Sequence, residues 1–211
     1  MKKLLFIFTV LSILTISTVS ESYAQGVYLG PRLTGNLNIF NQKGLTGTWN
    51  GIGVGIGGTV DISFSQNIGI MANLMAFDMK NFSNSTTANN QTTDFSMSLS
   101  YFSIDPMFKA EFSGFYMLGG ASIGIKISSS GERTISAQNQ QPNVASLSPE
   151  TKSMIFNFVF GTGYNFKLSP SMVLGSDLSV FIPITDTYNS PGISNSVLSL
   201  KLGASLKFKI N

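Results

Sequence analysis

The chain has 211 residues, of which 43% are hydrophobic and only 11% are charged, whereas a soluble domain usually carries about 25% Asp, Glu, Lys and Arg. The formal net charge is +3, and the sequence contains no histidine and no cysteine. These counts exclude a disulfide framework, a thiolate metal site and a lipid attached to cysteine. No cluster of basic residues with interleaved aromatics occurs, which argues against nucleic acid as a partner. We expect no cofactor and no metal.

The first 24 residues have the order of a secretory signal peptide. Lys2 and Lys3 form a basic start, residues 4–16 are an apolar run, and Ser22-Tyr23-Ala24 offers a small-x-small cleavage site. The alternative, a transmembrane anchor, would need about 20 apolar residues. We predict a signal peptide at residues 1–24 and one mature barrel domain at residues 25–211.

From residue 26 onward, apolar and polar side chains alternate with the period of two that is typical of β-strands. Eight segments carry this alternation: residues 26–39, 51–64, 68–79, 95–110, 115–128, 153–166, 171–183 and 196–210. In the second segment, residues 53–58 match the pattern G-x-G-x-x-G. A dinucleotide fingerprint must open a helix. Here a Ser65-Gln66-Asn67 turn follows instead, so we interpret the glycines as part of a strand.

Two segments alternate less regularly. Residues 68–79 are apolar on both parities, and Met71, Met75 and Met79 lie four apart, which would also fit a helix. The three-residue turn before this segment favours a strand. In residues 95–110 the apolar parity changes between Leu99 and Phe102, which predicts a β-bulge near residues 100–102.

The connections between the segments alternate in length. Those at residues 65–67, 111–114 and 167–170 are short, and those at residues 40–50, 80–94, 129–152 and 184–195 are longer and polar. This order predicts an all-β, eight-stranded antiparallel up-and-down barrel, with the long loops at one end and both termini at the other. Soluble strands have a mode of about 5 to 6 residues, and a tilted membrane strand needs about 9 to 11. The predicted strands are long enough to make the barrel transmembrane.

The polar parity of each strand should face the lumen, because Lys or Arg facing lipid at the midplane costs roughly 2 to 4 kcal/mol. We expect a lumenal charge network of Arg32, Asp61, Asp105, Lys109, Lys126, Asp177 and Lys201. Gly53, Gly55 and Gly57 should face the same lumen and leave space for larger side chains. Two interpretations of the charges stay open: an ion path, or a satisfied network that plugs the lumen. The narrow interior of eight strands favours the plug.

Aromatic residues gather toward both ends of the predicted strands, as two interfacial girdles would. Phe64, Phe112, Phe115, Phe166 and Phe208 lie near the turn end, and Phe40, Trp49, Phe77, Phe82, Phe95 and Phe181 lie toward the loop end.

Three stretches, GVYLGPRLTGNLNIF, SYFSIDPMFKAEFSGFYMLGGASIGI and VLSLKLGASLKFKIN, are similar to sequences of small outer-membrane barrels. Over residues 25–211 the chain resembles the outer-membrane β-barrel family, which includes porin-family, PorT-like and OmpA/OmpX-type members, and especially those of Bacteroidetes-type bacteria. The resemblance implies export to the outer membrane of a Gram-negative bacterium and contact with outer-membrane lipid. Such barrels usually end on an aromatic residue, whereas here Phe208 is followed by Lys209-Ile210-Asn211.

The sequence does not favour an enzyme. Acyl-transfer and lipase chemistry would use histidine as general base, and the one candidate carboxylate pair, Asp78 and Asp94, flanks a long loop. We expect a structural, adhesion or partner-docking role, with an extracellular or envelope protein bound through the loops at residues 80–94 and 129–152. The alternative is a small passive, porin-like channel for ions or small solutes. The resemblance to PorT-like proteins also implies an accessory role in secretion or gliding.

Overall fold

The structure is a computed structural model that describes residues 26–44, 49–137, 141–189 and 193–210. The predicted signal peptide lies outside these ranges. Nine strands occur within them: β1 (Gly26–Gln42), β2 (Trp49–Ser63), β3 (Ile68–Ala88), β4 (Gln91–Phe112), β5 (Phe115–Ala137), β6 (Asn143–Leu147), β7 (Met154–Ser169), β8 (Met172–Pro183) and β9 (Asn195–Lys209). No helix in the described part of the chain is long and apolar enough to cross a membrane.

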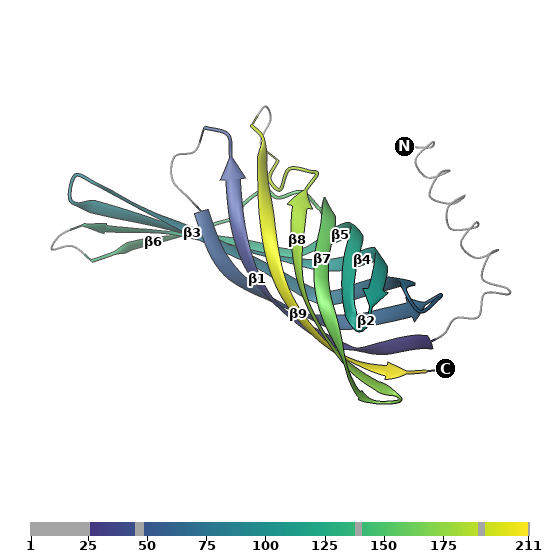
Figure 1. The fold of residues 1–211 in the computed structure, drawn as a ribbon. Helices are drawn as coiled ribbons and strands as arrows, with labels where there is room; N and C mark the ends of the chain where they lie inside the picture. The colour runs from purple at the N-terminus through teal and green to yellow at the C-terminus, as the bar shows by residue number, and fades with distance from the viewer. Residues whose placement is uncertain (1–25, 45–48, 138–140, 190–192, 211) are drawn as a thin grey trace.

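Eight of the strands close into a ring (Figure 1). Strands β1 to β5 each pair antiparallel with the next, β5 pairs with β7, and β8 and β9 lead back to β1. The start of β1 and the end of β9 are neighbours, since Tyr28 lies opposite Lys209. The prediction of an eight-stranded antiparallel up-and-down barrel is confirmed.

Three strands continue well beyond their predicted ends. Residues 80–94, predicted as a loop, instead extend the β3–β4 hairpin to Ala88 and Gln91, with Asn89 and Asn90 as the turn. Both turn residues have positive φ, 50° and 60°, as a type I′ hairpin turn requires. Much of the predicted loop at residues 129–152 is also strand, because β5 continues to Ala137 and β6 pairs with its far end. Residues 83–98, 128–137 and 143–147 form a sheet beyond the ring (Figure 1). The resemblance to outer-membrane barrels implies that this sheet lies outside the cell, and it is here named the extracellular extension.

A bulge in β3 explains why residues 68–79 are apolar on both parities. The register with both neighbouring strands shifts between Met75 and Asp78. Before the shift the lumenal residues are odd-numbered, such as Met71 and Met75, and after it they are even-numbered, such as Asp78 and Lys80. The apolar residues on the two sides of the bulge therefore fall on opposite parities.

The β4–β5 register also shifts, between Ser100 and Tyr101, within the stretch predicted to hold a bulge. The side chains of β4 nevertheless keep one parity. Leu99 and Tyr101 are both buried, and Phe102 and Phe108 are both exposed. The apolar parity of the sequence changes because the lumen itself is apolar near the loop end of β4.

The exterior of the ring is apolar. Ile52 is 73% exposed, Phe108 74% and Leu202 64%, and exposed large hydrophobic side chains occur on every strand of the ring. Contiguous apolar surface of this extent is foreign to soluble monomers, whereas lipid-facing strands require it. The polar parity faces inward, so each strand presents one face to lipid and one to the lumen.

The aromatic residues at the two ends of the barrel differ in the direction of their side chains. Near the turn end, Phe112, Phe115, Phe166 and Phe208 are exposed on the outside, as a girdle would be. Near the loop end, Phe40, Phe82 and Phe181 are buried in the lumen at 6%, 2% and 3% exposure. The expectation of a second girdle is wrong for these three residues.

Candidate functional site

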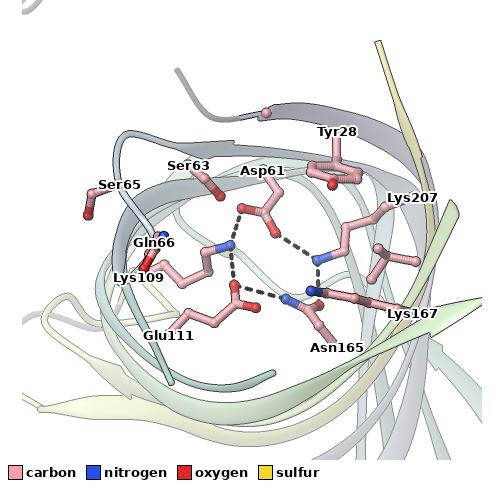
Figure 2. A pocket seen from close by; sticks show the side chains of 12 residues that line it. Tyr28, Asp61, Ser63, Ser65, Gln66, Lys109, Glu111, Asn165, Lys167 and Lys207 are labelled. Carbon is pink, nitrogen blue, oxygen red and sulfur yellow. Dashed lines mark hydrogen bonds and ion pairs between the residues drawn. The ribbon is translucent and has the colours of Figure 1, made fainter. Parts of the chain in front are cut away.

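The lumen is the candidate site, and its charged side chains form three groups along the barrel axis. The group nearest the termini centres on Asp61 of β2, whose carboxylate lies between Lys109 of β4 and Lys207 of β9 (Figure 2). The Lys207 Nζ lies 2.7 Å from Asp61 Oδ2 and 2.7 Å from Asn165 Oδ1. Lys109 Nζ also contacts Glu111 at 2.9 Å. Each ammonium thus has two oxygen partners.

The second group is a single buried pair. Both terminal nitrogens of Arg32 donate to the carboxylate of Asp177, each at 2.7 Å. The pair spans from β1 to β8 over the intervening strand β9, where Gly203 lies beneath the guanidinium. A Cβ at Gly203 would overlap the Arg32 guanidinium, so the missing side chain creates the space for the pair.

The third group centres on Asp78, which sequence reasoning placed at the edge of a loop. Asp78 Oδ2 lies 2.7 Å from Lys201 Nζ and 3.7 Å from Lys80 Nζ, and Asn36 donates to Oδ1 at 2.8 Å. Lys80 also donates to Ser199 at 2.9 Å. All of these side chains are buried.

The structure brings five of the seven predicted lumenal residues into direct ion pairs. Arg32 with Asp177, and Asp61 with Lys109, form direct pairs, and Lys201 joins Asp78. Asp78, Lys80, Glu111 and Lys207 were missing from the predicted set. Lys207 shares the parity of Lys201 in the alternating pattern of the last strand, and this signal could have identified it.

Two predicted members stand apart from the ion pairs. Asp105 is 2% exposed and accepts a hydrogen bond from Ser122, while its Oδ1 has no partner among the described residues. Internal water is the usual partner of such atoms. Lys126 lies toward the loop end of the barrel, opposite Tyr101, and donates to the backbone carbonyl of Thr151 at 3.0 Å.

The three predicted glycines face the lumen for two different reasons. At Gly53 and Gly57 an added Cβ would overlap the backbone carbonyls of β3, so these glycines permit close approach of two strands. At Gly55 it would lie 2.5 Å from Thr34 Oγ1, 3.0 Å from Met75 Cε and 3.2 Å from the backbone oxygen of Phe77. Of the three glycines, only Gly55 thus has side-chain atoms as the nearest neighbours of an added Cβ.

An aromatic plug closes the loop end of the lumen. Phe40 and Phe82 stack with ring centroids 4.9 Å apart, and the Tyr188 ring meets Phe40 edge-on at 5.5 Å. Leu99, Tyr101, Ile155 and Val197 complete the buried cluster. The segment that carries Tyr188 is fastened above it, because the Asn195 side-chain oxygen accepts the backbone N–H groups of Thr187 and Tyr188.

The one candidate carboxylate pair of the sequence is not brought together. Asp78 and Asp94 do not pair, since Asp78 is buried opposite Tyr101 whereas Asp94 is exposed opposite Ser85. Within the described ranges no three acidic side chains are grouped to hold a metal ion. What the geometry provides is a set of fixed ion pairs below an apolar plug.

A closed antiparallel ring with an apolar exterior and a charged interior defines a transmembrane β-barrel. In this protein the short turns lie at the end of the barrel that carries both strand termini, and the long hairpins lie at the opposite end.

Comparisons with solved structures return distant barrels. Neisserial surface protein A is 12% identical, with 89% of this chain and 99% of that chain covered and a TM-score of 0.44. OprG of Pseudomonas aeruginosa is 11% identical, with 88% and 96% covered and a TM-score of 0.43. Ail of Yersinia pestis, in complex with a heparin analogue, is 12% identical, with 87% and 99% covered and a TM-score of 0.40. At such distance these similarities say nothing of activity.

No family model and no curated protein sequence matches the chain. The narrower resemblance to PorT-like and Bacteroidetes-type proteins has no support in these comparisons and stays a prediction.

Proposed function

We propose that this protein is a closed, non-conducting barrel that acts through its extracellular extension, in adhesion, partner docking or support of the envelope. The observation that carries the proposal is the filling of the lumen. The charged side chains in the lumen form direct ion pairs with one another, and the aromatic plug fills the lumen at the loop end. A passive channel would instead need a continuous water-filled path. The charged lumen is therefore assigned a structural role.

The extracellular extension offers a surface suited to polar partners. Cross-strand rows on one face read Ser83–Ser96–Glu132–Ser146 and Ser85–Asp94–Thr134–Val144, in which Val144 is the one apolar member. A third row, Thr87–Thr92–Ser136, lies toward the tip of the hairpin. This face continues the exterior of the barrel, because Phe102 and Phe108 share the even parity of β4. Hydroxyl and carboxylate groups thus replace the lipid-facing side chains where the sheet leaves the membrane.

The proposed role is non-enzymatic. The chain has no histidine to act as a general base, and the buried carboxylates Asp61, Asp78 and Asp177 are each occupied by cationic side chains. The apolar exterior of the barrel would contact membrane lipid. A further partner would bind the hydroxyl and carboxylate face outside the cell.

Shortening the hairpin tests the proposal. Asn84 and Phe95 are cross-strand partners, so an Asn-Gly turn between them can replace residues 85–94 with the pairing register kept. The matched control changes only Asn89-Asn90 to Asn-Gly. We expect both barrels to fold, judged by their heat-dependent shift in electrophoretic migration, and only the shortened one to lose cell attachment or resistance of the envelope to large antibiotics. Unchanged attachment and resistance in cells with the shortened protein would contradict the role of the extension.

A further inference from the structure

The periplasmic mouth of the barrel is a vestibule with a cavity of about 410 Å³. Its floor is the Asp61, Lys109, Lys207 and Asn165 cluster, which closes the way into the lumen. Its walls come from both termini of the ring and from the first short turn, through side chains such as Tyr28, Ser63 and Gln66 (Figure 2). The vestibule is therefore a blind pocket that opens toward the periplasm.

The vestibule carries a surplus of positive charge. Lys109 and Lys207 at the floor are neutralised by Asp61 and Glu111. Lys167 of β7 lines the wall, and no ion pair to it occurs among the described residues. These contacts leave the charge of Lys167 available to a ligand.

Lys209 adds a second cation at the rim. It lies opposite Tyr28 in the β1–β9 register, and its Cε is 3.6 Å from the position of a Cβ on Gly26, which lines the cavity. The described residues offer it no carboxylate in ion-pair contact either. Four lysines thus face two carboxylates at this mouth, and the two rim lysines account for the excess.

We propose that the vestibule binds an anionic group, a carboxylate or a phosphate, presented from the periplasm. The rim ammonium groups of Lys167 and Lys209 supply the attraction, and the hydroxyl groups of Tyr28 and Ser63 supply uncharged hydrogen-bond donors within the same cavity. Lys109 and Lys207 at the floor already form ion pairs with Asp61, so the ligand would bind above them. The barrel would then have a second binding surface, on the opposite side of the membrane from the extracellular extension and independent of it.

Binding can be measured with the mature protein in nanodiscs of zwitterionic phosphatidylcholine. Inorganic phosphate and the dicarboxylate glutarate serve as probes, followed by calorimetry and by the amide resonances of Gly26 and Ser63. We expect saturable binding of at least one probe, weakened by added salt because the rim lysines are exposed. The probe that saturates at lower concentration distinguishes a phosphate source from a carboxylate source.

Substitutions assign the site. Lys167→Gln and Lys209→Gln should each weaken binding about two- to five-fold, the range of an exposed charge contact, and the double variant should abolish saturation. Lys43→Gln, an exposed lysine at the extracellular end, serves as the matched control and should leave binding unchanged. The proposal is overturned if neither probe saturates, or if the double variant binds like the unmodified protein.

Discussion

Arg32 and Asp177 face each other across β9 and form two parallel hydrogen bonds of 2.7 Å between strands that are not neighbours. Their side chains are 4% and 1% exposed. Ser179 donates a further hydrogen bond to Asp177 at 3.2 Å. A bidentate pair in this setting fixes the distance between β1 and β8 through the lumen.

Loss of one partner should therefore cost more than loss of both. Arg32→Ala or Asp177→Ala leaves a buried charge without its counter-ion, which destabilises by about 3–5 kcal/mol. The double variant Arg32→Met with Asp177→Leu should lose much less, because no uncompensated charge remains. Urea titration of the barrel in phospholipid vesicles measures the free energy of unfolding. Lys43→Ala, at an exposed position, provides the baseline, and single variants as stable as this baseline would contradict the structural assignment.

Gly203 should be intolerant of side chains for the same reason. A valine here would occupy the space of the Arg32 guanidinium, and overpacking alone costs about 1–3 kcal/mol. The matched control is Gly35→Val, because Gly35 is exposed on the outside of β1 and has no atom within 4 Å of an added Cβ. In the same urea titration Gly203→Val should have a lower free energy of unfolding than Gly35→Val. Equal free energies would show that the Arg32 side chain can move away from Asp177 without loss of stability.

The glycines of β2 give a graded prediction. Gly53→Val places its side chain against the backbone of β3, which cannot move without breaking the sheet, whereas Gly55→Ala meets the flexible end of Met75 and the hydroxyl of Thr34. We expect Gly53→Val to abolish the folded band in heat-dependent electrophoresis and Gly55→Ala to reduce stability by about 1–3 kcal/mol. A folded, stable Gly53→Val barrel would mean that residue 53 does not lie against β3.

The ring of eight strands could be predicted because lipid and lumen impose opposite polarity on alternate residues. The extracellular extension lacks this contrast. Water surrounds both of its faces, so residues 83–94 show Ser, Thr and Asn at both parities and resemble a loop. Their strand conformation comes from pairing with neighbours already in register, which a period-two search does not detect.

Asp78 and the aromatic plug escaped prediction for more local reasons. The bulge before Asp78 reverses the parity of β3, so a uniform pattern puts this carboxylate on the wrong face. Phe40 and Phe82 of the plug, and Phe181 elsewhere in the lumen, are aromatic residues of the kind expected in a lipid girdle, and their burial shows that they point inward. The charged pairs Arg32–Asp177 and Asp61–Lys109 lie on regular parities, and both pairs consist of residues in the predicted lumenal set.

The tip of the long hairpin provides a test of the extension alone. Asn90 has φ of 60°, a conformation that a β-branched residue adopts only under strain. Asn90→Val should speed amide hydrogen exchange at Thr86 and Thr93, which are cross-strand partners near the turn, and leave exchange in the barrel unchanged. Asn90→Gly is the matched control, with slow exchange retained. Equal exchange in both variants would argue against the described turn.

Conductance of the mature protein in a planar lipid bilayer tests most directly whether the lumen is closed. The aromatic plug and the paired charges predict a bilayer without conductance steps, both for the unmodified barrel and for Asp105→Ala. Stepwise conductance that changes on Arg32→Ala or Asp105→Ala would contradict the account, because ions would then pass the side chains that are assigned here to a plug.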